Sequence, residues 1–542
     1  MFGGINKKEW QFLGIFWIVI AIIVFLPIII GYLVTPPGSH FLFDSSYASA
    51  DHQAYLSKIE QAKRGSYLFK DFFTSETQPL GVLNPFWLAI GIFAKVFNLS
   101  GLIAFHVVNF LLLPVFLIVS YRTVSFFFEE ESRRKVCCIL LLIASGIGVW
   151  VNTFLLGASL QFPSMATPEA FFLTALFFSP HFTASLILLM LVLLLSFRAF
   201  ENYQLRYSLL AGLCVLLLIS FHPYSVYTIF FMILAFIVAE SVFEKKIYLS
   251  HIGHYAILLV FAAPPLLYDI WVLINVPAYY ETLFLQNITL TQNILVVLVD
   301  YGPLLLLAVI GAIPVLRQRP VKKRDMFLIV WVLTGFFLLY LPVNTQRRLF
   351  EGLNIPIIIL ATSGLFFLKD WQGKGLFGRT ITSIKKAWLS PLQKPFLVFL
   401  MMVIFSMPHL VRVTSEFLFY NNYYITSDNY KAMEWIDGNT PKESIILSSL
   451  KNGNIMPVIA YRQVYLGHWG ETIRFMEKKE LAGRFFWNYS SEERRHFLQT
   501  NNIGYIFWGP EERVLTDNFN PDQEDFLQKV YGNGSVAVYR VN

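Results

Sequence analysis

Charged residues are scarce in this chain. They make up 14% of its 542 residues, whereas soluble domains carry about 25%, and 56% of the residues are hydrophobic. So few charges cannot cover the surface of a soluble protein of this length, and the composition predicts a polytopic α-helical membrane protein. The formal net charge of +7 does not indicate nucleic-acid binding, because Lys and Arg gather in short loops between apolar segments.

Cysteine is almost absent, and several catalytic sequence patterns are missing. Cys137, Cys138 and Cys214 all lie in apolar segments, and the polar C-terminal region has no cysteine, which excludes a disulfide framework there. The sequence contains no glycine-rich phosphate-binding loop, no Cys/His metal pattern and no Ser/His/Asp arrangement. These absences argue against an enzyme that uses ATP or a nucleotide sugar.

Long apolar runs dominate the chain. The first, residues 11–34, covers about 36 Å as a helix, which is enough to cross a bilayer core. It is too long for a signal peptide and lacks a small-residue cleavage site, so we expect an uncleaved first span. About eleven spans are predicted in all, the others at residues 101–126, 136–157, 181–199, 207–222, 223–243, 250–273, 292–316, 325–343, 350–369 and 395–414.

The basic residues set the expected orientation in the membrane. Lys7 and Lys8 place the N-terminus inside, under the positive-inside rule. The basic stretches 317–324 and 369–394 fall on that same side only if His222-Pro223 separates two spans rather than kinking one. We therefore expect a multi-pass protein of the cytoplasmic (inner) membrane whose C-terminal region lies outside the cytoplasm.

Two domains are expected. Residues 1–414 form a transmembrane domain whose first external loop is 35–100, and residues 415–542 form a small extracytoplasmic α/β domain, because polar helix and strand patterns replace the apolar runs there. In that domain a helix, a turn at Pro441 and a strand are expected first. A second helix is predicted over residues 464–486, and strands over 504–509 and 535–541.

The first external loop is unusually acidic. It contains Asp44, Asp51, Asp71 and Glu76 close to the expected bilayer surface. Carboxylates at a membrane edge are costly to desolvate, so such groups are functional candidates. We expect Asp71 to be a helix-start or solvated loop residue, and the others to be candidates for chemistry.

A helix is expected within this loop. Ser45 or Ser46 would cap it, and Gly65 would end it after Arg64. On this helix Asp51, Tyr55 and Lys58 share one face by their spacing. A second, shorter apolar helix, 85–97, is predicted to lie in the outer membrane interface, because it is too short to span.

Three short motifs follow the first span. They are Asp51-His52-Gln53-Ala54-Tyr55-Leu56, Phe73-Thr74-Ser75-Glu76 and Asn84-Pro85. An external helix that carries an Asp before Tyr-Leu, followed by an acidic residue and Asn-Pro, resembles the GT-C superfamily of glycosyltransferases, including mannosyltransferase-like members. The resemblance covers the membrane part, and the C-terminal domain is similar to those attached to many bacterial members. It implies a polytopic enzyme that takes a sugar from a polyprenyl-phosphate carrier on the external face.

The chemistry of such a transfer needs a base for the acceptor hydroxyl, or a metal that orients and polarises the reactants. The resemblance implies that Asp51 has this role, with Asp44 as the alternative and Glu76 in support. These acids could instead cap and solvate an interfacial helix. A divalent cation such as Mg²⁺ or Mn²⁺ is an open possibility, with Asp51 and Glu169 as its ligands if one binds.

A second set of candidates lies between later spans. Glu169 follows Thr167-Pro168 in the second external loop, where some GT-C enzymes also place an acid, although a place in the first turn of a helix explains it equally well. His181 and His222 lie at the expected outer ends of spans and could bind a phosphate or an acceptor hydroxyl. Buried, hydrogen-bonded structural histidines are the alternative.

Arg347 and Arg348 lie on the expected outer face, against the positive-inside trend. An arginine fork fits phosphate oxygens, and GT-C enzymes often place an arginine for the carrier phosphate in this late loop. We expect one of the two to hold the phosphate, and Tyr55 to contribute to substrate binding. Pairing of one arginine with Glu351, or binding of ordinary anionic lipids, are the alternatives.

The C-terminal region offers aromatic and polar side chains that could stack on sugar rings, but packing and folding explain them better. They are Trp435, His468, Trp469, Glu471 and Trp487. The leading hypothesis is an inverting hexosyltransferase of the cell envelope that moves a sugar from a polyprenyl-phosphate donor to a hydroxyl of a glycan, lipid or protein. The alternatives are a non-enzymatic transporter or flippase of lipid-linked saccharides, and an inactive GT-C-like scaffold that binds glycan.

Overall fold

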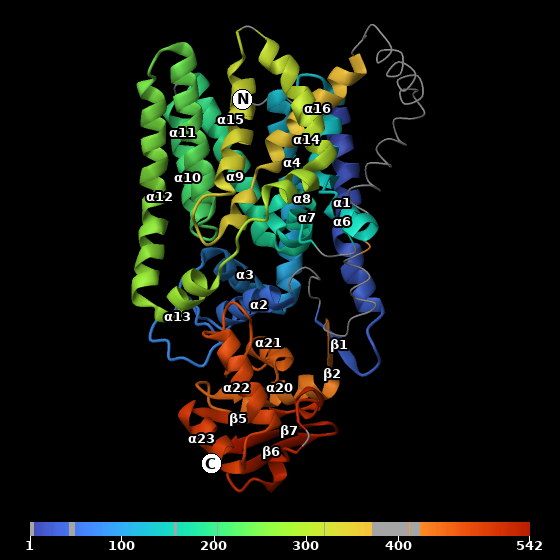
Figure 1. Cartoon of the computed structure of the whole chain (residues 1–542), viewed down its shortest axis with the longest axis vertical. Coiled ribbons are helices and arrows are strands. Elements are labelled where there is room, and N and C mark those ends of the chain that lie inside the picture. Colours follow the sequence, from blue (N-terminus) through green and yellow to red (C-terminus); the bar gives the residue numbers. More distant parts are fainter. Residues whose placement is uncertain are drawn as a thin grey trace. The chain divides into compact units, whose positions relative to one another are not determined.

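The chain divides into two compact units in the computed structural model (Figure 1). Unit 1 consists of residues 1–25, 109–267 and 289–413, and unit 2 of residues 26–108, 268–288 and 414–542. The structure describes residues 5–42, 49–156, 160–202, 204–318, 320–370, 411, 423–516 and 518–542. The predicted domain boundary at residue 414 lies outside these described residues.

Seven helical segments within the described residues are long and apolar enough to cross a membrane. They are α1 (Lys7–Leu33), α4 (Gly101–Phe127), α9 (Pro180–Asn202), α11 (Ser225–Glu244), α12 (Leu249–Asn275), α14 (Ile294–Arg317) and the segment Gln346–Leu368, which joins η4 (Gln346–Phe350) to α16 (Asn354–Asp370). An eighth candidate is a pair bent by 52°, formed by α5 (Glu131–Ile143) with α6 (Gly148–Val151) and the start of η1 (Asn152–Leu156). The predicted class, a polytopic α-helical membrane protein, is confirmed.

The remaining predicted spans are shorter helices or lie outside the described residues. Helix α10 (Leu205–Ile219) has 15 residues and α15 (Lys323–Leu338) has 16. The span expected at 395–414 falls in a part of the chain that, apart from Val411, is not described. The break expected at His222-Pro223 is confirmed, since it separates α10 from α11.

In unit 1, α14 and α16 approach each other closely through glycine. A Cβ atom added at Gly311 would lie 1.9 Å from the carbonyl oxygen of Leu360, and one added at Gly364 would lie 2.0 Å from that of Leu307. Small residues let membrane helices pack backbone to backbone. Asp300 of α14 accepts hydrogen bonds from the Gly148 and Ser164 amides at 2.8 and 2.7 Å, which ties the bent α5–α6 pair to α14.

Three short helices of unit 1 follow that bent pair. They are α7 (Pro163–Ala166), η2 (Pro168–Ala170) and α8 (Phe172–Phe178). All three are largely buried, and η2 carries Glu169.

In unit 2, the first loop folds into two packed helices. Helix α2 (Ser49–Lys63) is followed by Gly65 at φ +101°, the left-handed conformation expected of a glycine at a helix end. Helix α3 (Pro85–Val96) begins at Asn84, whose side chain accepts from the amides of the first turn, and it confirms the predicted short apolar helix. The two helices bury Leu56 and Ile59 of α2 against Ile90 of α3.

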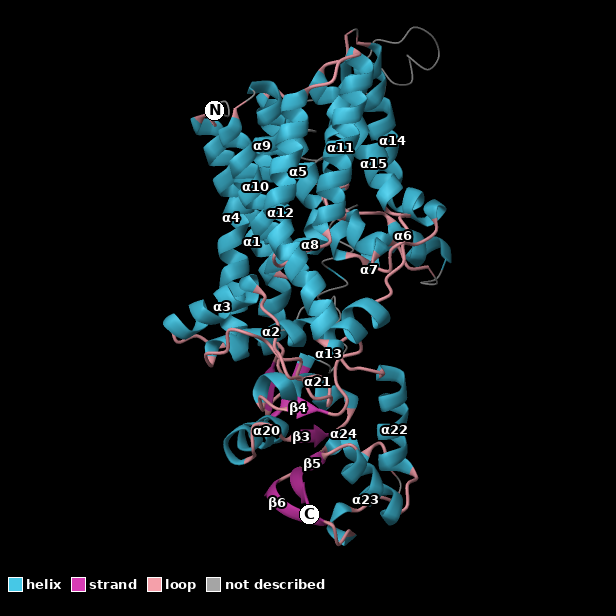
Figure 2. Ribbon diagram, turned by 90° about the vertical axis from the view of Figure 1, so that its left-hand side faces the viewer, coloured by secondary structure: helices cyan, strands magenta, loops and turns pink. Residues whose placement is uncertain are grey.

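The C-terminal part of unit 2 is a five-stranded mixed sheet, drawn in magenta in Figure 2. The strand order is β4-β3-β5-β7-β6, with β4, β3 and β5 parallel and β7 antiparallel to both neighbours. The strands are β3 (Ile445–Leu447), β4 (Gln463–Val464), β5 (Ile503–Trp508), β6 (Leu527–Asn533) and β7 (Val536–Val541). The predicted small α/β domain is confirmed.

Alternate residues of the strands bury against different helices. Phe507 and Val538 pack with α20 (Ser427–Asn439) and α21 (Leu450–Ile459), whereas Ile506 and Tyr539 pack with α22 (Phe475–Trp487) and α23 (Ser491–Thr500). Strand side chains point to opposite faces with a period of two, so both faces of the sheet are covered. Shorter elements of unit 2 are β1 (Ser39–Phe41), which pairs with β2 (Tyr424–Thr426), α13 (Pro277–Tyr279), η3 (Tyr280–Gln286), α24 (Pro510–Arg513) and η6 (Pro521–Gln523).

The helix predicted over residues 464–486 is wrong in its first half. Val464 ends strand β4, and α22 begins only at Phe475. The intervening segment contains Gly467 and Gly470, which disfavour helix, and the amides of Gly470 and Glu471 bond to the His468 side chain.

Candidate active site

Asp51 lies in the first turn of α2 and is hydrogen-bonded to a histidine of the C-terminal sheet domain. The distance from His468 Nε2 to Asp51 Oδ1 is 2.8 Å, although the two residues are 417 positions apart. The Asp51 side chain is 21% exposed and that of His468 is 5% exposed. The leading candidate for the catalytic base therefore keeps access to solvent while one of its oxygens is held in place.

A second ion pair joins α2 to the same loop. Lys58 Nζ lies 3.1 Å from Glu471 Oε1. Burial alone would lower the pKa of Lys58, but the adjacent Glu471 carboxylate raises it above its ordinary value. Because Asp51 and Lys58 are seven residues apart on a helix, they share a face, and both meet residues 468–471.

Tyr55 packs against a neighbouring helix. Its ring stacks on Trp87 of α3, with ring centroids 4.6 Å apart and an interplanar angle of 15°. This contact contributes to the packing of α2 on α3, and the predicted role of Tyr55 in substrate binding stays a prediction.

Glu76 is engaged by a buried lysine. Lys478 Nζ of α22 lies 2.7 Å from Glu76 Oε1 and also donates to Ser75 Oγ at 2.9 Å. Burial lowers the pKa of Lys478, and Glu76 opposes that shift. Thr74 donates a short hydrogen bond to the same carboxylate. These contacts favour a structural role for Glu76.

Asp71 is buried, contrary to the expectation of a solvated loop residue. Its side chain is enclosed, and Oδ1 accepts from the Phe73 amide at 2.8 Å. Burial, together with the charge of Glu471, raises the pKa of the Asp71 carboxyl well above its usual range. The loop closes over this side chain because Gln78 bonds to both the Asp71 amide and its carbonyl oxygen.

Asp44 lies outside the described residues, as do Ser45 and Ser46, the expected helix caps. The alternative in which Asp44 replaces Asp51 stays a prediction.

In unit 1, the two adjacent arginines have different surroundings. Arg348 Nη1 donates to Glu169 Oε1 at 2.6 Å, and the Glu169 side chain is only 1% exposed. The guanidinium of Arg347 has no hydrogen bond or ion pair with any residue that the structure describes. The Glu351 carboxylate accepts a short hydrogen bond from Ser225 and lies 3.6 Å from His222 Nδ1, and within the described residues it forms no ion pair with either arginine.

The two candidate histidines are buried and bonded to serines. His181 Nδ1 lies 2.8 Å from Ser179 Oγ, and His222 Nδ1 lies 3.0 Å from Ser225 Oγ. The two rings are 6.0 Å apart. This environment favours structural histidines, and their predicted contact with substrate stays untested.

The residues considered for a cation do not come together as a metal site. Among the residues that the structure describes, no group of three or more His, Cys, Asp or Glu side chains could hold a metal ion. Asp51 and Glu169, the ligands considered from sequence, belong to different units.

His468, Glu471 and Lys478 are the residues that sequence reasoning undervalued. His468 and Glu471 stand in the string GHWGE, which has no recognisable catalytic spacing. The sequence does give one sign of a functional loop here. The segment is polar, contains Gly467 and Gly470 and lies between apolar segments, and such loops commonly carry functional side chains.

Comparisons with known proteins give structural matches alone. No family model and no curated protein matches the chain. It is similar to ArnT from Cupriavidus metallidurans bound to undecaprenyl phosphate, with a TM-score of 0.55, 10% identity, and 99% of this chain and 98% of that chain covered.

Two further solved structures extend this likeness. The apo oligosaccharyltransferase of Archaeoglobus fulgidus matches with a TM-score of 0.51, 14% identity, and 93% of this chain and 70% of that chain covered. The arabinofuranosyltransferase AftD from Mycobacteria matches with a TM-score of 0.55 and 13% identity over 100% of this chain, which spans 42% of that chain. At these identities the likeness establishes the fold.

Proposed function

Because the chain has the fold of the GT-C glycosyltransferases, we propose that it is a membrane glycosyltransferase. It moves a sugar from a polyprenyl-phosphate donor to an acceptor hydroxyl on the extracytoplasmic face. The observation that carries the proposal is the Asp51 carboxylate, which is partly exposed and oriented by His468. ArnT, which shares the fold along its whole length, was solved with undecaprenyl phosphate bound.

Asp51 acts as the general base in this mechanism. A carboxylate within hydrogen-bond reach of an acceptor hydroxyl takes up its proton as the oxygen attacks. The new bond forms between that oxygen and the anomeric carbon of the sugar. The bond from the anomeric carbon to the phosphate oxygen breaks on the opposite side, and the lipid phosphate leaves with the electron pair. The configuration at the anomeric carbon is inverted.

Arg347 holds the phosphate of the carrier. Arginine presents a planar fork of donors that matches phosphate oxygens. Arg348 already pairs with Glu169, whereas the guanidinium of Arg347 makes no hydrogen bond or ion pair within the described part of the chain and interacts with Glu169 only at longer range. Arg347 is therefore the arginine available to a lipid phosphate, and Glu169 positions its neighbour.

A divalent cation stays a proposal of its own. If Mg²⁺ or Mn²⁺ binds, Asp51 would hold it in place of acting as the base, and the cation would polarise the donor phosphate. Chelation by EDTA followed by addition of each metal tests this requirement directly.

The test is a transfer assay on the full chain in detergent or liposomes. Lipids that co-purify with the protein are first identified by mass spectrometry, which names the donor. The wild type should then transfer sugar from that lipid to one of a panel of glycan, lipid and peptide acceptors. Asp51→Asn should lower the rate by about 10²- to 10⁴-fold, while Asp525→Asn, which changes a carboxylate paired at the surface with Arg495, serves as the matched control.

Two outcomes would overturn the proposal. One is a wild type that transfers no sugar from any co-purifying lipid, and the other is an Asp51→Asn variant with full activity. A wild type that only moves lipid-linked saccharide between the leaflets of a liposome would instead support the transporter alternative.

A further inference from the structure

We propose that His468 is a positioning residue for Asp51, so that the C-terminal sheet domain completes the active site. This inference rests on the proposed transferase function. In it, the neutral imidazole donates Nε2–H to one oxygen of the Asp51 carboxylate and directs the other oxygen toward the acceptor hydroxyl.

The backbone of the loop determines which nitrogen of His468 carries the proton. His468 Nδ1 lies 3.0 Å from the amide nitrogen of Gly470 and 3.0 Å from that of Glu471, and both amides donate to it. A nitrogen that accepts two N–H groups cannot also carry a proton. In the neutral imidazole the proton must then be on the other nitrogen, so Nε2 is the donor toward Asp51.

The loop that carries His468 is held in place independently of Asp51. Thr472 Oγ1 donates to the carbonyl oxygen of Phe73 at 2.6 Å and accepts from the Gly467 amide at 3.0 Å. The Thr472 amide closes the turn by donating to the His468 carbonyl oxygen at 2.8 Å. The imidazole is therefore positioned by its own loop before it meets the carboxylate.

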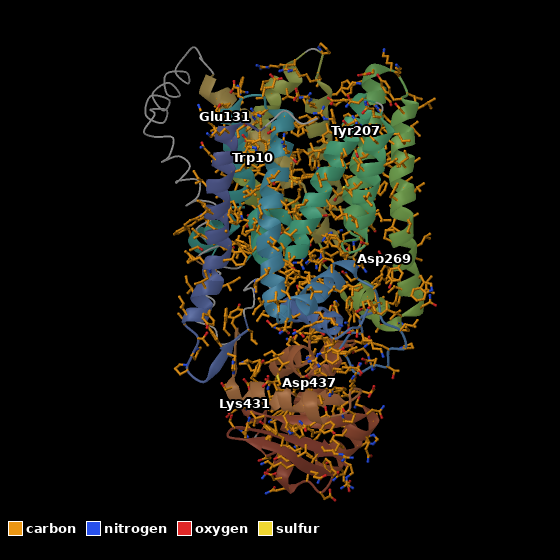
Figure 3. The ribbon with its side chains drawn as sticks, turned by 180° about the vertical axis from the view of Figure 1, so that it is seen from behind. Trp10, Glu131, Tyr207, Asp269, Lys431 and Asp437 are labelled. Carbon is orange, nitrogen blue, oxygen red and sulfur yellow. The ribbon has the colours of Figure 1, made fainter. Side chains whose placement is uncertain are left out.

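Helix α2 is held against the same loop. The Lys58–Glu471 pair lies two turns along α2 from Asp51. At the C-terminal end of the helix, Nη1 and Nη2 of Arg64 each donate at 2.8 Å to Asp437 of α20, which is labelled in Figure 3. Both members of the Asp51–His468 bond thus lie on segments whose separation is set by other contacts.

This geometry is what a general base requires. A base is effective when a third group orients it toward the proton that it takes. The hydrogen bond from His468 fixes the orientation of the Asp51 carboxylate. Because two backbone amides donate to Nδ1, that nitrogen is the acceptor of the ring and Nε2 is its donor.

Two substitutions separate positioning from a merely structural role. His468→Asn places an amide oxygen near Nδ1, where it can still accept from the loop amides, but it has no group that reaches Asp51. His468→Gln places an amide N–H near Nε2, where it can still donate to Asp51, but it loses the acceptor for the loop. The exposed His496 on α23, changed to Asn, is the matched control.

The two variants should differ in opposite directions: the Asn variant should lose more activity, and the Gln variant should lose more stability. His468→Asn should keep the thermal midpoint of the wild type and lower kcat by about ten- to hundredfold, the range expected for one hydrogen bond to a charged group, with the KM for donor little changed. His468→Gln should lower the thermal midpoint but retain more kcat than the Asn variant. Nitrogen chemical shifts of labelled histidine should also report the Nε2–H tautomer of His468 in the wild type.

The reverse order of activities, with Asn active and Gln inactive, would show that His468 only shapes its loop and would overturn the inference. A protonated imidazole or the Nδ1–H tautomer would overturn it too. These results leave the transferase function standing if the wild type transfers sugar and Asp51→Asn does not. A wild type without transfer overturns both proposals.

Discussion

Lys478 of α22 reaches Glu76 of the first loop, with Nζ and Oε1 2.7 Å apart. The lysine side chain is 4% exposed and the glutamate 29% exposed, so the pair is largely withdrawn from water. Together with Arg64–Asp437 and Lys58–Glu471, this contact holds the acidic loop to the sheet domain by charge. The surface that presents Asp51 is thus built by two parts of the chain that are far apart in sequence.

Breaking this pair should destabilise the protein. Glu76→Gln removes the charge that compensates the enclosed Lys478 ammonium. Leaving a buried charged group without its partner costs about 1–3 kcal/mol, so the thermal midpoint should fall. Glu477→Gln, whose side chain is 53% exposed on the same helix, should leave it unchanged. Equal midpoints for the two variants would contradict this prediction.

Arg347 and Arg348 should respond differently to substitution. Arg347→Gln should raise the KM for the lipid-phosphate donor by about tenfold or more, because a charge-assisted hydrogen bond to phosphate is lost. Arg348→Gln should mainly lower the thermal midpoint, because it leaves the buried Glu169 carboxylate unpaired.

The double variant Arg348→Gln with Glu169→Gln provides the control. It removes the unpaired charge and should recover part of the lost stability. A KM for donor that changes in Arg348→Gln but not in Arg347→Gln would reverse the assignment of the phosphate ligand.

Because α14 packs closely on α16, one added methyl group at their contact should lower the stability of the protein. Gly311→Ala would place Cβ 1.9 Å from the Leu360 carbonyl oxygen, so the helices must move apart. Overpacking of this kind costs about 1–3 kcal/mol, measured as a lower thermal midpoint in detergent. Gly253→Ala in α12, where nothing lies within 4 Å of the new Cβ, should be neutral or stabilising.

Asp71 should make stability fall as the pH rises. Its pKa in the folded protein is raised by burial and by Glu471, relative to about 3.9 in an unfolded chain. An acid with a raised folded pKa contributes stability that is fully present below the unfolded pKa and lost as the pH passes through the folded pKa.

Asp71→Asn removes this titrating carboxyl group, so the stability of the variant should fall less as the pH rises. The charged groups that act on Asp71 include Glu471, Lys58, Glu76 and Lys478, and all remain in the variant. The thermal midpoints of wild type and variant, compared from about pH 4 to pH 8, should diverge in favour of the variant as the pH increases. Parallel curves would show that the carboxyl is not protonated in the folded protein.

The elements of this protein could be predicted from local sequence. Apolar runs such as residues 11–34 identify membrane helices by length alone, and Asn84-Pro85 and Gly65 mark where helices begin and end. The strands around Phe507 and Val538 follow from short runs of apolar and aromatic residues. Local patterns also gave one wrong prediction. They predicted a helix from Val464 onward, where the structure has a loop that contains Gly467 and Gly470.

The partners of the acidic and basic side chains were decided only by the tertiary structure. From the sequence, Arg348 could pair with Glu351 as readily as with Glu169, and nothing linked Asp51 to His468, 417 residues away. Helix and strand patterns depend on neighbours within a few residues, whereas these contacts depend on how α2 meets the loop before α22. The amino-acid sequence therefore determined which acids were candidates, and the packing of distant segments determined which side chain each of them contacts.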